Sequence, residues 1–106
     1  MNINILELTE KNFDAVVKKG NWIIDFWTVW CGPCKIMEPH FEAAALELKG
    51  KVKFAKVNVD ENYALADQFG IMTVPTTLFF KDNELVEQTT GALTKEQILK
   101  KVRDVL

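Results

Sequence analysis

One nearly continuous apolar run limits the possible folds of this chain more than any other feature. Residues 22–27 read Trp-Ile-Ile-Asp-Phe-Trp, with a single charged side chain. A strand that is apolar on both faces belongs in the centre of a sheet covered by helices on both sides. A helical pattern follows from about Cys31 to Lys49 and ends at Gly50. The run therefore predicts a central strand followed directly by a helix.

The rest of the chain continues this alternation. Strands are also expected at 3–8, 52–59, 76–80 and 85–89, and helices at about 9–19, 63–69 and from 94 onward. Thr9 is the expected N-cap of the first helix, and Thr94-x-x-Gln97 forms a capping box for the last. The order βαβαβαββα predicts an α/β fold with a central mixed five-stranded β-sheet flanked by four α-helices.

Composition limits the classes of function that fit. The chain has 106 residues with a net charge of −2 and no cluster of Lys and Arg, so we expect one domain over residues 1–106 and no nucleic-acid partner. No apolar run reaches the roughly 20 residues of a membrane span, and Met1–Ile5 does not resemble a signal peptide. A cytoplasmic protein without membrane contact is expected, and in that compartment a Cys-x-x-Cys pair is usually catalytic.

The two cysteines, Cys31 and Cys34, lie where the central strand gives way to the helix. Thiols three residues apart on one helical turn have Cα atoms about 5–6 Å apart, within reach of a disulfide. Gly32 allows a tight turn and Pro33 fits the first helical turn. Unpaired N–H groups and the helix dipole favour a thiolate on Cys31. The spacing therefore predicts thiol–disulfide exchange in which Cys31 attacks and Cys34 resolves.

Two other uses of the pair are weaker. A structural zinc ion needs four ligands, and the chain contains only two Cys and one His, His40. A purely structural disulfide would close a very small loop and would constrain the unfolded chain little. We therefore expect no metal and no cofactor other than the redox-active Cys31–Cys34 disulfide.

The run Trp-Cys-Gly-Pro-Cys-Lys at residues 30–35 resembles the active site of the thioredoxin family, and the expected elements are similar to the thioredoxin fold over essentially the whole chain. The resemblance implies a general protein disulfide reductant that supports cell redox homeostasis. It implies disulfide-containing target proteins and a thioredoxin reductase as partners, and a monomer.

Asp25 interrupts the apolar strand, and Lys56 lies on the following strand. If the strand is central, burial should raise the pKa of Asp25 and suit it to accept a proton. From the residues alone, a buried and a solvated Asp25 are equally open, and an exposed strand lysine is the favoured interpretation of Lys56. The resemblance implies that Asp25 assists the resolving Cys34, with Lys56 near it.

Val74-Pro75 is the second motif. X–Pro bonds are mostly trans, so sequence alone favours trans. The resemblance implies a cis bond facing the cysteines, which leaves the preceding backbone free to pair with an extended substrate. It also implies a flat apolar docking surface made of Trp30, Gly32, Pro33, Thr73, Val74, Pro75, Gly91 and Ala92. Trp27 is expected to be mostly buried and Trp30 more exposed.

Some residues depart from the family pattern. Thr77 stands where leucine is common and His40 where an aliphatic residue is usual; neither is expected to take part in exchange. Val29, Met72 and Thr73 could alter which partners dock. Rival functions are an oxidase or isomerase on the same fold, a non-catalytic binding module, and a zinc site shared between two chains.

Overall fold

The computed structural model describes residues 4–106, and the element order is the expected one with one added 3₁₀ turn. The elements are β1 (Ile5–Glu7), α1 (Phe13–Val17), β2 (Asn21–Trp27), α2 (Gly32–Glu47), β3 (Lys53–Asn58), the 3₁₀ turn η1 (Val59–Glu61), α3 (Tyr63–Gln68), β4 (Thr76–Lys81), β5 (Glu84–Thr90) and α4 (Lys95–Val105). The strands form one sheet in the order β1-β3-β2-β4-β5. β1, β3 and β2 are parallel, whereas β4 pairs antiparallel with both β2 and β5. The mixed five-stranded sheet is confirmed.

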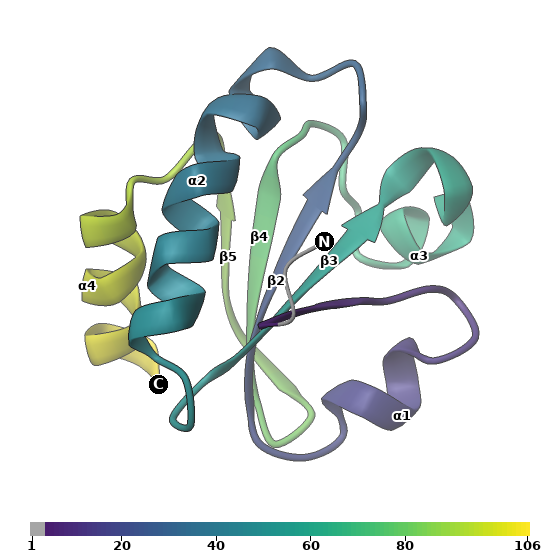
Figure 1. Cartoon of the computed structure of the whole chain (residues 1–106). Coiled ribbons are helices and arrows are strands. Elements are labelled where there is room, and N and C mark those ends of the chain that lie inside the picture. The colour runs from purple at the N-terminus through teal and green to yellow at the C-terminus, as the bar shows by residue number, and fades with distance from the viewer. Residues whose placement is uncertain (1–3) are drawn as a thin grey trace.

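Helices cover both faces of the sheet. Figure 1 shows α2 and α4 on one side and α1 and α3 on the other. Each side has its own apolar core, because residues of the strands alternate between the two faces. Ile24 and Phe26 of β2 pack on the side of α1 and α3, and Ile23 packs on the side of α2 and α4. This two-sided burial explains why the strand at 22–27 is almost wholly apolar.

The chain reverses between β4 and β5 at the predicted turn. Asp82 and Asn83 have φ values of 47° and 73°. Positive φ at both central residues is typical of the two-residue hairpin turns whose twist matches that of the strands. Asp82 also accepts a hydrogen bond through Oδ1 from the backbone N–H of Gly20, at 2.9 Å, which ties the hairpin to the start of β2.

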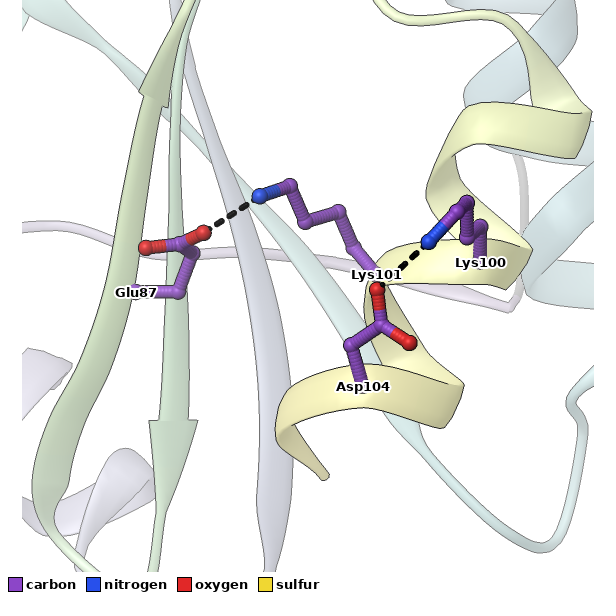
Figure 2. Close-up of polar contacts among 4 residues, drawn as sticks. All are labelled: Glu87, Lys100, Lys101 and Asp104. Atoms are coloured by element: carbon purple, nitrogen blue, oxygen red, sulfur yellow. Dashed lines mark hydrogen bonds and ion pairs between the residues drawn. The ribbon is translucent and has the colours of Figure 1, made fainter.

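The last helix has the predicted cap and is fastened to the sheet. The Thr94 side chain accepts from the Gln97 N–H at 3.1 Å, and the Gln97 side chain accepts from the Thr94 N–H at 2.8 Å. Figure 2 shows Lys101 reaching from α4 to Glu87 on β5, while Lys100 pairs with Asp104 within the helix.

The start of the chain differs from expectation. The predicted strand at 3–8 is shorter, as β1 covers Ile5–Glu7, and Ile3 lies outside the described residues.

The prediction of Thr9 as a helix N-cap is wrong. The Thr9 N–H donates to Asn12 Oδ1 at 2.8 Å and the Thr9 hydroxyl accepts from the Lys11 N–H, so residues 9–12 form a turn and α1 begins only at Phe13. The Phe13 N–H donates to the Thr9 carbonyl at 3.0 Å, so Thr9 begins one isolated turn and the regular helix follows it.

Within residues 4–106, no helix is both long enough and apolar enough to cross a membrane.

Candidate functional site

The cysteine pair lies at the edge of the sheet where β2 ends and α2 begins (Figure 1). Cys31 and Cys34 form a disulfide with Cα atoms 5.2 Å apart, inside the range expected from their spacing. Both residues are largely covered, with 8% and 6% of their surface exposed. In an open α/β sheet, the carboxyl end of a central strand is the usual place for a site.

The helix N-terminus acts on the sulfur of Cys31. Cys31 is the N-cap of α2, and the backbone N–H of Cys34 donates to its Sγ at 3.0 Å. Free N–H groups and the helix dipole place partial positive charge here. After reduction, this environment lowers the free energy of a thiolate on Cys31.

The proline loop lies against the same sulfur. The Val74–Pro75 bond is cis, as the resemblance implied, and the carbonyl oxygen of Val74 lies 3.5 Å from Sγ of Cys31. The backbone N–H of Gly91 donates to the Pro75 carbonyl at 2.8 Å, and Gly91 has a φ of 92°, a conformation that suits glycine. The start of β4 and the end of β5 are therefore held together beside the disulfide.

Exposed apolar side chains surround this edge. Trp30 is 88% exposed and Met72 is 93% exposed, whereas Trp27 is half-buried. The remaining predicted docking residues are exposed except for half-buried Val74 and buried Pro75: Gly32, Pro33, Thr73, Gly91 and Ala92. Large exposed aromatic and thioether side chains next to a reactive group are typical of a protein-docking surface.

Asp25 is buried, as expected for a central strand. Only 6% of its surface is exposed, and its Oδ1 makes no hydrogen bond within residues 4–106. Burial raises the pKa of Asp25 from 3.8 to about 7; the nearby Lys56 acts to lower it and Glu38 acts to raise it further. A carboxylate with a pKa near neutrality can both take and release a proton at physiological pH.

Lys56 is the partner of Asp25 in the β2–β3 register. It is half-buried, and its Nζ lies 5.3 Å from the centre of the Trp27 ring and 4.0 Å from the Glu7 carboxylate. A cavity of about 520 Å³ lies between Lys56 and the start of α2. Its lining includes Asp25, Lys56 and Cys34. The predicted catalytic residues are thus brought together.

Two acidic residues of this cavity were missed in the sequence. Glu38 and Glu42 line it from α2, beside Cys34. The signal was present, because residues at i, i+4 and i+8 of a helix share one face, and Cys34 is followed by Glu at both positions.

His40 is half-buried, and its Nδ1 accepts the backbone N–H of Lys95 at 3.0 Å. It therefore links α2 to the first turn of α4. In the part of the chain that is described, no three His, Cys, Asp or Glu side chains are grouped as a metal site requires.

Comparison with known proteins agrees with this geometry. The sequence profile of the family described as Thioredoxin matches residues 4–104. A thioredoxin of Staphylococcus haemolyticus is 40% identical over 94 residues, which cover 89% of this chain and 90% of that protein. Thioredoxins of Staphylococcus saprophyticus and Staphylococcus aureus are 40% and 38% identical over the same shares of both chains.

Proposed function

Because the chain belongs to the thioredoxin family and is a dithiol–disulfide oxidoreductase, we propose that Cys31 attacks target disulfides and Cys34 resolves the product, which makes the protein a general disulfide reductant. The observation that carries this division of roles is the hydrogen bond from the Cys34 N–H to Sγ of Cys31. It stabilises negative charge on one sulfur only.

The exchange has two steps. The Cys31 thiolate attacks one sulfur of a target disulfide, forms a mixed disulfide and releases the other target sulfur as a thiolate. Cys34 then loses its proton, attacks Sγ of Cys31, and releases the second target thiolate. Two electrons pass from the two cysteines to the target, and the Cys31–Cys34 disulfide remains. A reductase must return two electrons before the next cycle.

Asp25 is the proposed acceptor of the Cys34 proton. Its pKa of about 7, raised by burial, is closer to the pKa of a thiol than the pKa of an exposed aspartate is. Lys56 opposes the effect of burial, so that Asp25 remains partly ionised at neutral pH. The cavity that both residues share with Cys34 supports a short proton path.

The proposed docking surface consists of Trp30, Gly32, Pro33, Thr73, Val74, Pro75, Gly91 and Ala92. The contact between the Val74 carbonyl and Sγ of Cys31 supports it, because a target strand paired with this backbone would bring its disulfide to the sulfur. We propose a monomer that works in the cytoplasm, with disulfide-containing proteins as targets and a thioredoxin reductase as electron donor. A reducing compartment suits a pair that must be returned to the dithiol form.

The midpoint potential of the Cys31–Cys34 couple, measured in graded thiol–disulfide buffers, tests the reductant role. We expect about −270 mV, which is the general reference value for thioredoxin. A value of about −180 mV, as in protein disulfide isomerase, would contradict a reductant and favour an oxidase or isomerase.

A double Cys31→Ser, Cys34→Ser variant separates the reductant from a binding module. The variant should not cleave a disulfide-linked peptide at all, as measured by chromatography, because no cysteine sulfur remains to attack. If the variant keeps the biological activity of the parent protein, the protein acts by binding a partner and not by disulfide exchange.

A further inference from the structure

A row of polar side chains crosses the whole sheet beside the active site. Strand register joins Glu7 to Lys56, Lys56 to Asp25, Asp25 to Thr77, and Thr77 to Thr89, one residue from each strand. Residues paired in register point to the same face. This face is the one covered by α2 and α4. Ile23 and Phe79, each two residues along the strand from Asp25 and Thr77, pack in the core on that side.

Three members of the row have a buried oxygen without a partner. Oδ1 of Asp25, Oγ1 of Thr77 and Oγ1 of Thr89 make no hydrogen bond to any of residues 4–106. Thr77 is completely buried, with 0% of its surface exposed. Buried polar atoms without a partner are rare, because each one costs free energy relative to hydration in the unfolded chain. Three in adjacent register positions call for a common explanation.

We propose that Thr77 is a positioning residue for disulfide exchange, whose hydroxyl donates a hydrogen bond to the Asp25 carboxylate when Asp25 ionises. The inference rests on the proposed role of Asp25 as the acceptor of the Cys34 proton. Directly opposed side chains on antiparallel strands have Cβ atoms about 4.5–5.5 Å apart, so rotation of the side chains can bring the two oxygens together.

A hydrogen bond from Thr77 to Asp25 also leaves Thr77 able to pair with Oγ1 of Thr89, the third unpaired oxygen. A hydroxyl donates one hydrogen bond and accepts others, so Thr77 can donate to Asp25 while it accepts from Thr89. Asp25 then lies between a cation on β3 and a hydrogen-bond donor on β4. Lys56 also faces Trp27 and Glu7, whereas the Thr77 hydroxyl has no competing partner among the described residues.

The charged groups around Asp25 are not touched by replacement of Thr77. They are Lys56 of β3 and Glu7 of β1, with Lys35, Glu38 and Glu42 of α2; Cys34 is neutral in the disulfide. On β5, Glu87 lies on the same face and is paired with Lys101 of α4. A change in the titration of Asp25 after replacement of Thr77 therefore reports on the hydroxyl.

The test compares Thr77→Val, Thr77→Ser and Thr89→Val in the disulfide form. Valine has the shape of threonine without the hydroxyl, serine keeps the hydroxyl, and Thr89 lies one strand further away. The carboxyl ¹³C resonance of Asp25 is followed through a pH titration. We expect its midpoint to rise in Thr77→Val, to stay near the wild-type value in Thr77→Ser, and to rise less in Thr89→Val.

A different pattern overturns the inference. If the hydroxyl of Thr77 stays unpaired in both states of Asp25, Thr77→Val leaves the titration unchanged and makes the protein more stable to urea. An equal rise in Thr77→Val and Thr89→Val would show a general effect of polarity rather than a bond to Asp25.

The kinetic test separates this inference from the proposed function. The pH dependence of the resolving step is measured with a disulfide-linked peptide in wild type, Thr77→Val, Asp25→Asn and the double variant. We expect Thr77→Val to shift the profile to higher pH and to have no further effect in the Asp25→Asn background. If Asp25→Asn slows the step and Thr77→Val does not shift it, only the role of Thr77 fails. If Asp25→Asn changes nothing, the role of Asp25 fails, and that of Thr77 in exchange fails with it.

Discussion

At the scale of single residues, the site sets two groups in opposite electrostatic conditions. Sγ of Cys31 accepts an N–H at the start of a helix, which favours its charged form. Asp25 is buried on a central strand, which disfavours its charged form and raises its pKa to about 7. The first condition supports the proposed attack by Cys31, and the second supports the proposed role of Asp25 as the base for Cys34.

The raised pKa of Asp25 predicts how stability depends on pH. The folded protein holds a proton on Asp25 up to about pH 7, whereas the unfolded chain releases it near 3.8. Stability is therefore full below pH 3.8 as far as this group is concerned, and it falls as the pH rises from about 4 to about 7. The total loss is on the order of 4 kcal/mol.

Urea unfolding of the disulfide form at several pH values checks this. Asp25→Asn removes the titrating group, so the variant should lose most of the fall between about pH 4 and 7 and be the more stable protein at about pH 8. Parallel curves for wild type and variant would show that Asp25 is not the group responsible.

At the scale of secondary structure, α2 does more than present the cysteines. Its residues at intervals of four, Cys34, Glu38 and Glu42, line the cavity that faces Asp25. A carboxylate placed there disfavours ionisation of a second carboxylate nearby. The helix thus combines a positive N-terminus at Cys31 with a negative face one turn further along.

We expect Glu38→Gln to lower the pKa of Asp25, because Glu38 acts to raise it. The shift should be on the order of a few tenths of a pH unit, as for charges that interact partly through water, and salt should reduce it. A ¹³C titration of Asp25 at low and high salt measures it. Glu84→Gln is the matched control, because Glu84 lies in the β4–β5 hairpin at the opposite end of β4 from Pro75. An equal shift in both variants would mean that only net charge matters.

At the scale of the whole molecule, the sheet separates two apolar cores, and only one of them lies on the face that carries Asp25. The core on the side of α1 and α3 contains four phenylalanines, and the ring of Phe13 lies 5.3 Å from that of Phe69 and 5.8 Å from that of Phe80. The other face carries Asp25 and is covered by α2. We therefore expect that packing in the core of α1 and α3 can be altered without changing the redox site.

Phe13→Ala tests this separation. The loss of a buried ring should destabilise the protein by about 3–5 kcal/mol, measured by urea unfolding. The alkylation rate of Cys31 in the reduced, folded variant should remain that of the wild type, because the cavity lies on the other face of the sheet. A large change in that rate would show that the two cores are coupled.

Much of this protein was determined locally by its sequence. The apolar run at 22–27, the capping box at Thr94 and the turn at Asp82–Asn83 each specify an element through residues close together in the chain, and the structure confirms them. Cys31 and Cys34 could be paired from their spacing alone. The error at Thr9 was also local, since Thr9 begins an isolated turn in front of the helix rather than the helix itself.

Only the tertiary structure decided what surrounds those cysteines. Asp25, Lys56 and Thr77 come from three strands, and their alignment depends on strand register. The approach of the Val74 carbonyl to Cys31 likewise joins residues 43 positions apart. No local pattern specifies such neighbours, because backbone pairing between distant segments and burial on both faces of the sheet bring them together. For the same reason, Thr77 stood in the sequence as a mere departure from the family pattern, and its place beside a buried carboxylate emerged only from the folded sheet.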